Sequence, residues 1–173
     1  MKYNGIDLKS HISVSGIVHS SSVDGTGFRD VLFVNYCPHH CDGCHNPETW
    51  DRKNGKLMTV ESVYEELTQS SLTNVTFSGG EPFEQARELA FLAKCIKENY
   101  KKTFWVYSGY TFEQIIADPE KKVLLDECDV LVDGKFEKNN RELNMRFRGS
   151  LNQRIIDIKK SLEQGEVILY DLD

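Results

Sequence analysis

Residues 37–46 read Cys37-Pro38-His39-His40-Cys41-Asp42-Gly43-Cys44-His45-Asn46, which places three cysteines in a CxxxCxxC pattern. Thiolates are ligands for soft metals, and this spacing lets three sulfurs converge from one loop. A histidine from the same loop would complete a Cys3His zinc site, whereas an iron–sulfur cluster uses the thiolates alone. The cysteines by themselves leave zinc and iron–sulfur about equally open.

The cysteine loop follows a strand, and polar residues follow the next strands in the same way. β-type patterns predict strands at residues 12–18, 30–36, 74–77, 103–107 and 129–132. The second of these runs directly into Cys37, while Gly79, Ser108 and Asp133 come just after the last three. Because ligands bind beyond the carboxyl ends of parallel strands, we expect all of these residues at one edge of a sheet.

Helical patterns alternate with the strands. Apolar spacing predicts helices at 60–67, with Thr59 as N-cap, at 84–100 and at 112–117, whereas 51–56 is expected to be a polar loop. The final segments 154–158 and 166–170 look like strands. The alternation predicts an α/β fold with a mainly parallel sheet and covering helices. A complete barrel takes about 250 residues, so we expect a partial (βα) barrel; an open doubly wound sheet is the alternative.

Composition limits the class of protein. The 173 residues suit a single domain, 39% of them are apolar and 28% are charged, as in soluble globular proteins. No apolar run approaches the roughly 18 residues of a membrane span, and the start lacks a signal peptide, so we expect a cytoplasmic protein with no membrane partner. Five cysteines there favour metal or redox chemistry over disulfides. The net charge of -6 argues against nucleic-acid binding.

A second motif favours the iron–sulfur cluster over zinc. Gly79-Gly80-Glu81-Pro82 follows the strand at 74–77, and no fourth cysteine lies near the first three. A 4Fe–4S cluster held by three thiolates leaves one iron open to an exogenous ligand, as catalytic metal sites do. Two glycines let backbone come close to such a ligand, and Glu81 can accept a hydrogen bond from an ammonium group.

The two motifs resemble the radical S-adenosylmethionine (SAM) superfamily, and within it the activating enzymes of glycyl-radical proteins. The match narrows to the activating proteins of anaerobic (class III) ribonucleotide reductases over roughly residues 25–157. The stretches that carry it are Gly25-Thr26-Gly27-Phe28-Arg29, Cys44 to Trp50, Trp105 to Tyr110, Val130 to Phe136, and Arg148-Gly149-Ser150-Leu151-Asn152-Gln153. Activating enzymes of pyruvate formate-lyase share the cysteines, the Gly-Gly-Glu loop and an Asp-x-Lys, but they are usually longer, and they remain the nearest alternative.

The resemblance implies a radical SAM activase that uses a 4Fe–4S cluster and SAM. Cys37, Cys41 and Cys44 would hold the cluster, and a flavodoxin-like donor would reduce it. SAM would then be cleaved to methionine and a 5'-deoxyadenosyl radical, which would remove a hydrogen atom from a glycine in the large subunit of the partner reductase. The cofactors supply this chemistry, while the protein supplies orientation and excludes water and oxygen.

The resemblance also implies which residues contact SAM. Gly79, Gly80 and Glu81 would meet its amine. Asp133 and Lys135, two apart on an extended segment, point to one side and would meet its ribose hydroxyls and carboxylate; a surface ion pair is the plainer interpretation.

Gly43, Cys44 and His45 are also candidate SAM contacts. Most of the superfamily has an aromatic residue beside the adenine at the position of Gly43, so what contacts the adenine here stays open.

Three residues near the C-terminus have several candidate roles, and two other classes of protein stay open as alternatives. Arg148, Ser150 and Asn152 are candidates for binding substrate, partner or the SAM carboxylate, in a C-terminal segment of about 140–173 that we expect to pack on the cluster domain. Cys95 and Cys128 are expected to be small buried or half-buried residues rather than ligands. A zinc-binding interaction module would show metal-dependent folding without turnover. An electron-transfer protein would usually have a fourth cysteine near the cluster.

Overall fold

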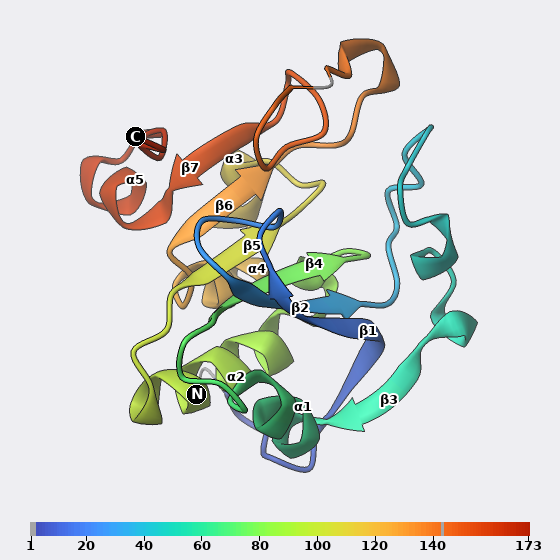
Figure 1. The fold of residues 1–173 in the computed structure, drawn as a ribbon, viewed down its shortest axis with the longest axis vertical. Helices are drawn as coiled ribbons and strands as arrows, with labels where there is room; N and C mark the ends of the chain where they lie inside the picture. Colours follow the sequence, from blue (N-terminus) through green and yellow to red (C-terminus); the bar gives the residue numbers. More distant parts are fainter. Residues whose placement is uncertain (1–2, 143) are drawn as a thin grey trace.

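The computed structural model describes residues 3–142 and 144–173, which form a mixed α/β fold around one seven-stranded sheet (Figure 1). The strand order is β3-β1-β2-β4-β5-β6-β7. The strands are β1 (His11–Ser21), β2 (Arg29–Val34), β3 (Lys56–Thr59), β4 (Asn74–Gly79), β5 (Phe104–Tyr107), β6 (Val130–Asp133) and β7 (Arg154–Asp157). The α-helices are α1 (Val60–Leu67), α2 (Ala86–Asn99), α3 (Phe112–Ile116), α4 (Pro119–Leu125) and α5 (Ile158–Gln164). Short 3-10 helices are η1 (Pro47–Thr49), η2 (Arg52–Asn54), η3 (Pro82–Gln85) and η4 (Lys138–Asn140).

The middle of the sheet is parallel and its margins are antiparallel. Strands β2, β4, β5 and β6 run in the same direction, while β1 and β3 on one side and β7 on the other run against their neighbours. Helices α2 and α4 provide crossovers between parallel strands, which a tight hairpin cannot do. The α/β expectation with a mainly parallel centre is confirmed, and the carboxyl ends of β2, β4, β5 and β6 lie along one edge.

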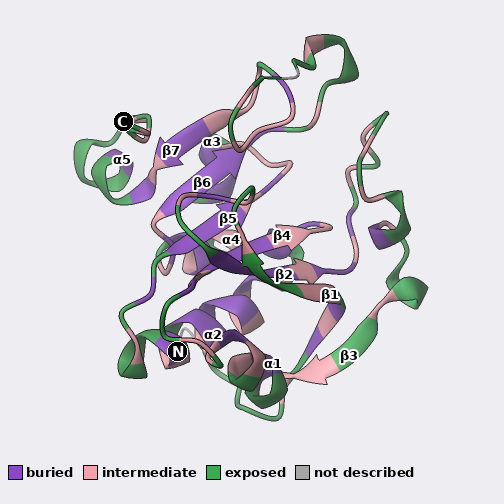
Figure 2. Ribbon diagram, viewed as in Figure 1, coloured by how far each residue is buried: buried purple, intermediate pink, exposed green. Residues whose placement is uncertain are grey.

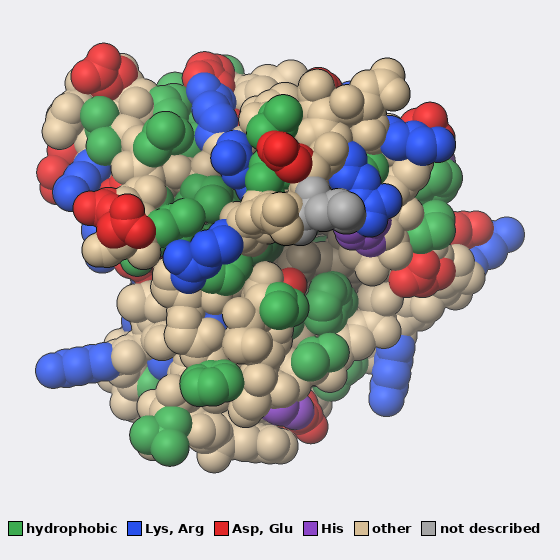
Figure 3. Space-filling model, turned by 45° about the horizontal axis from the view of Figure 1, so that its top comes forward, with side chains coloured by type: hydrophobic (Ala, Val, Ile, Leu, Met, Phe, Trp, Pro, Cys, Tyr) green, Lys and Arg blue, Asp and Glu red, His purple; other side chains and the backbone are tan. Residues whose placement is uncertain are grey.

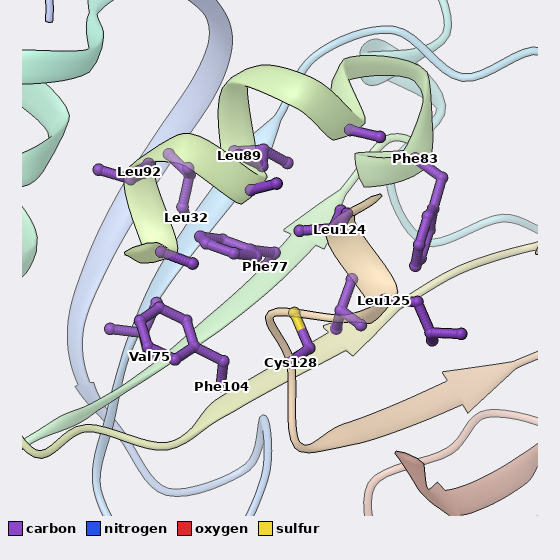
Figure 4. Packing of buried hydrophobic residues seen from close by; sticks show 14 of the residues in the cluster. Leu32, Val75, Phe77, Phe83, Leu89, Leu92, Phe104, Leu124, Leu125 and Cys128 are labelled. Atoms are coloured by element: carbon purple, nitrogen blue, oxygen red, sulfur yellow. The ribbon is translucent and has the colours of Figure 1, made fainter. Parts of the chain in front are cut away.

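The helices cover one face of the sheet. Buried side chains of α1, α2, α3 and α4 pack with alternate strand residues such as Leu32, Phe77 and Phe104 in a single apolar cluster (Figures 2 and 4). Cys128 lies within this cluster, as expected of a small buried residue. The cover by α1–α4 is therefore one-sided, which differs from a doubly wound sheet with helices on both faces.

The opposite face carries a smaller apolar cluster and a buried arginine. Trp105 contacts the rings of Phe147 and Tyr170 edge-on, so the C-terminal segment packs on this face. Arg29 is 1% exposed and donates hydrogen bonds to Thr76 Oγ1 and to backbone or side-chain oxygens of Thr26, Val75 and Thr103. Burial lowers the pKa of Arg29 to about 10. Its guanidinium ties the loop before β2 and the residue before β5 to the start of β4.

Most expected elements are confirmed, including α1 with its cap: the Thr59 hydroxyl accepts from the Ser62 amide. Three elements, β3, α4 and α5, were not expected; β3 begins at Lys56, the end of the expected loop. The expected strand at 166–170 is wrong, because only one bridge forms, between Leu169 and Ile156. The amide of Ile168 donates instead to the Ser161 hydroxyl of α5, which interrupts the ladder. No helix in the described part of the chain is long and apolar enough to span a membrane.

Candidate functional site

A cavity of about 390 Å³ opens at the carboxyl edge of the parallel strands, on the face opposite the helices. Each parallel strand contributes lining residues through the loop that follows it: the cysteine loop after β2, Gly79 and Gly80 at β4, Ser108 and Gly109 after β5, and Gly134 after β6. Figure 3 shows one face of the molecule with a hollow bounded by several kinds of side chain. The expected gathering of these loops at one edge is confirmed.

The cysteine loop, residues 37–44, turns sharply to bring its thiols to the cavity. Tyr36, His40 and Gly43 all have positive φ values, of 81°, 50° and 74°, and the Cys44 amide donates to the Cys41 carbonyl at 3.1 Å. Positive φ is uncommon outside glycine, so the fold around the loop has to hold it. His40 stacks on Trp50 with ring centroids 4.7 Å apart, which fixes the loop from outside.

All three thiols of the loop line the cavity, and backbone amides face their sulfurs. Cys37 is 9% exposed; burial raises the pKa of its thiol to about 11, partly offset by hydrogen bonds from the His39 and His40 amides. Burial likewise raises the pKa of Cys41, against a hydrogen bond from the Phe136 amide. The Cys44 sulfur accepts from the Asn46 amide at 3.4 Å.

Three thiols at one cavity suit an iron–sulfur cluster, and an amide donor such as that on the Cys44 sulfur stabilises thiolate and tunes cluster potential. Among the described residues, no three His, Cys, Asp or Glu side chains are close enough together to hold a single metal ion. In an iron–sulfur cluster each cysteine binds its own iron, so the three thiols need not share one metal ion.

The Gly79-Gly80 backbone is fastened to the start of the cysteine loop. Gly80 and Glu81 donate their amides to the carbonyls of Val34 and Tyr36, both at 2.8 Å. Gly79 has φ +99°, and a Cβ there would lie 2.6 Å from Val34 backbone atoms. A Cβ at Gly80 would lie 2.3 Å from the Tyr36 carbonyl oxygen. Both glycines are thus needed for the backbones to approach each other.

Replacing Gly80 with alanine should destabilise the protein by about 2–3 kcal/mol, because either the Tyr36 or the Gly80 backbone must move. Denaturant unfolding of the metal-free protein measures this. Gly16→Ala is the control: nothing lies within 4 Å of its Cβ position, so its unfolding free energy should change far less. Equal losses in the two variants would contradict the proposed close approach.

Glu81 is turned into the protein rather than toward the cavity. Its carboxylate is fully buried and lies 2.7 Å from His39 Nε2. It accepts hydrogen bonds from the Ser108 hydroxyl and from the amides of Gly109 and Phe83. Glu81 therefore joins the loops after β2, β4 and β5 at one carboxylate, and its expected contact with the SAM amine stays a prediction.

Asp133 and Lys135 take different environments. Asp133 is 1% exposed, accepts from the Phe112 amide at 2.8 Å and pairs with Arg154, its cross-strand neighbour on β7, at 2.6 Å. Lys135 is exposed and lies near Cys41, whose thiol it influences electrostatically. Neither side chain lines the cavity, while Gly134 between them does. Their expected contacts with SAM also stay predictions.

The remaining expected SAM contacts also differ in whether they line the cavity. Cys44 and His45 line the cavity, whereas Gly43 lies against Phe136 and Lys138: its Cβ position is 3.3 Å from the Phe136 ring and 3.4 Å from Lys138 Cδ. His45 contacts the same Phe136 ring, with centroids 5.2 Å apart. Phe136 therefore packs against the loop at Gly43, from a different segment of the chain.

The Arg148-to-Gln153 stretch fastens the loop after β6. Asn152 donates to the Lys135 carbonyl at 2.8 Å, and the buried Ser150 hydroxyl accepts from the Glu137 amide at 3.2 Å. Arg148 lines the cavity while it donates to the Gln153 carbonyl. Ser150 and Asn152 thus have structural partners.

His39 is the main site residue that sequence reasoning missed. Its ring is buried between Glu81 and Tyr110, and a Cβ at Gly109 would lie 2.4 Å from it. The sequence signals were a histidine between Cys37 and Cys41 and a glycine after β5, which leaves room for the ring.

Comparison with known proteins agrees with this site. Residues 23–156 match the family described as a 4Fe-4S single cluster domain. The chain is 38% identical over 139 residues to the anaerobic ribonucleoside-triphosphate reductase-activating protein of Enterobacteria phage T4, covering 77% of this chain and 86% of that protein. The proteins of the same name from Pasteurella multocida and Vibrio cholerae are 35% and 36% identical, over 77% of this chain and 89% and 90% of theirs.

Fold, cysteine loop and family match together define a protein with a single 4Fe–4S cluster domain. The chain belongs to the family of anaerobic ribonucleoside-triphosphate reductase-activating proteins.

Proposed function

We propose that this protein reductively cleaves SAM at a 4Fe–4S cluster and thereby generates a glycyl radical on the large subunit of an anaerobic ribonucleoside-triphosphate reductase. The observation that carries the proposal is the convergence of three thiols and the Gly79-Gly80 backbone on one cavity. Three cysteines leave an iron for SAM to bind, and about 390 Å³ is within the range of small-molecule sites. The names of the related proteins are the basis for proposing an anaerobic ribonucleoside-triphosphate reductase as the partner.

In this proposal each part of the site has a separate role. Cys37, Cys41 and Cys44 hold the cluster, which when reduced supplies the electron that splits SAM into methionine and a 5'-deoxyadenosyl radical. The Gly79-Gly80 backbone lets SAM approach without a side chain in the way. Glu81 positions that backbone through His39 and the loop after β5, and Lys135 places a positive charge beside Cys41.

The proposal extends to the fold and to the partners. We infer a single radical SAM domain over residues 1–173, in which the one-sided sheet is a partial barrel whose open face holds the cofactors. The segment from about 140 to 173 closes part of that face through Phe147 and Tyr170. A flavodoxin-like donor in the cytoplasm supplies the electron.

The reaction can be tested directly. Anaerobically reconstituted protein, reduced and mixed with SAM, should release 5'-deoxyadenosine; addition of a class III reductase should produce a glycyl-radical signal in electron paramagnetic resonance. Bound zinc with no 5'-deoxyadenosine would contradict the proposal and favour an interaction module. 5'-Deoxyadenosine with a radical on pyruvate formate-lyase, and none on the reductase, would favour the other activating enzymes.

A further inference from the structure

The segment from Lys135 to Arg148 is basic in a chain that is otherwise acidic. It carries five cations, Lys135, Lys138, Arg141, Arg146 and Arg148, and two acids, whereas the whole chain has 21 Lys and Arg against 27 Asp and Glu. We call these five residues the basic segment. Within the described residues, none of them lies within ion-pair distance of a carboxylate, while six Lys and Arg elsewhere do.

The basic segment lies against the cysteine loop. The Phe136 ring is 3.3 Å from the Cβ position of Gly43 and contacts the His45 ring, with centroids 5.2 Å apart. Lys138 Cδ is 3.4 Å from the Cβ position of Gly43. An electron that arrives at this segment is therefore close to the loop that carries Cys41 and Cys44.

Four of these five cations are separate from the interior of the cavity, and the fifth, Arg148, lines it. Lys135, Lys138, Arg141 and Arg146 are exposed and do not line it. The lining includes apolar side chains instead, among them Val23, which is 73% exposed, and Phe147. Figure 3 shows Lys and Arg side chains along one rim of the hollow. A partner that delivers only an electron can contact this rim and leave the cavity free for the glycine-bearing partner.

We propose that the basic segment is the docking surface for an acidic protein that carries one low-potential electron. This inference rests on the proposed function, which needs such a donor. One electron passes from the donor to the cluster held by Cys37, Cys41 and Cys44, so the donor is oxidised and the cluster reduced by one electron, and no bond is made or broken. With a net charge of -6 the chain as a whole repels an acidic donor. A local basic surface beside the cluster steers it to the productive contact.

The test uses charge reversal on the fully cluster-loaded protein. The variant Lys138→Glu/Arg141→Glu/Arg146→Glu changes three exposed side chains. The control Lys101→Glu/Lys159→Glu/Lys160→Glu makes the same change in charge before β5 and after β7, at the opposite edge of the sheet. Reduction is followed by the loss of visible cluster absorption, first with a reduced flavodoxin and then with photoreduced 5-deazariboflavin, a small uncharged donor.

With flavodoxin at low ionic strength, the basic-segment variant should be reduced at least tenfold more slowly than wild type, and added salt should narrow the difference. The control should be affected far less, and both variants should match wild type with 5-deazariboflavin. Equal rates with flavodoxin, or equal slowing in the control, would overturn the inference. An unchanged rate of cluster reduction by flavodoxin, together with weaker binding of the reductase, would also overturn the inference. It would assign the surface to the reductase.

The same samples separate this inference from the proposed function. With 5-deazariboflavin as donor and SAM present, wild type and both variants should all release 5'-deoxyadenosine. If the clusters are reduced but no sample releases 5'-deoxyadenosine, the proposed function fails. The test of docking is unaffected, because it depends only on the rate at which cluster absorption is lost.

Discussion

Replacing Cys41 with alanine should leave the reconstituted protein without its 4Fe–4S cluster. Cys41 is one of three thiols that line the cavity, and two thiolates cannot hold a cubane whose fourth iron already lacks a protein ligand. Wild type should bind about four irons per chain and absorb broadly in the visible range. The variant should retain a small fraction of that iron and make no 5'-deoxyadenosine.

Cys95→Ala is the matched control for the loss of a thiol. Cys95 lies on α2, which covers the helical face of the sheet away from the cavity. The iron content and visible absorption of the Cys95→Ala variant should equal those of wild type. If both variants lost the cluster equally, the choice of ligands would be wrong; if Cys41→Ala kept four irons, the loop would not be the cluster site.

Replacing Glu81 with glutamine should loosen the site while leaving the three thiols in place. One carboxylate oxygen lies against His39 Nε2 and the Gly109 amide, and the other against the Phe83 amide. Whichever way the glutamine amide turns, its NH₂ group faces an N–H donor, and a buried group left unpaired costs about 1–3 kcal/mol. The free energy of unfolding should fall by that amount.

The same variant should bind SAM roughly tenfold more weakly, a loss of about 1.4 kcal/mol, because the Gly79-Gly80 backbone is no longer held in place. Binding is measured by titration of the reconstituted protein, with iron content as the check on cluster assembly. Glu98→Gln, at an exposed position of α2, should change neither quantity appreciably. Wild-type SAM affinity in Glu81→Gln would remove this residue from the site.

The sequence was sufficient to predict the strands, helices and caps that depend on a short local pattern. The strand before Cys37 and the Thr59 cap of α1 were read from periodicity and from a single hydroxyl. Helix α4 was missed although Asp118 and Pro119 form an N-cap followed by a first-turn proline, which is a recognised start signal. The interruption of 166–170 by the Ser161 hydroxyl has no local signature, because it depends on where α5 returns against β7.

Within the site, motifs identified residues but not the direction of their side chains. The Gly-Gly-Glu loop was placed correctly, yet two of the partners of Glu81, Ser108 and Gly109, come from beyond the whole of α2. Asp133 pairs with Arg154 only because β7 adds antiparallel to β6. A pattern that spans a few residues carries no information about such distant donors.

The buried guanidinium of Arg29 divides the molecule into two halves with different tolerance for change. It fastens the amino-terminal ends of the central strands from within, by bonds to Thr26, Val75 and Thr103, so that end does not depend on the loops around the cavity. Changes in the exposed loops of the carboxyl edge should therefore leave the amino-terminal ends of these strands in place, whereas a change at Arg29 should not. The architecture thus separates the residues that hold the sheet at its amino-terminal edge from the loops that shape the cavity.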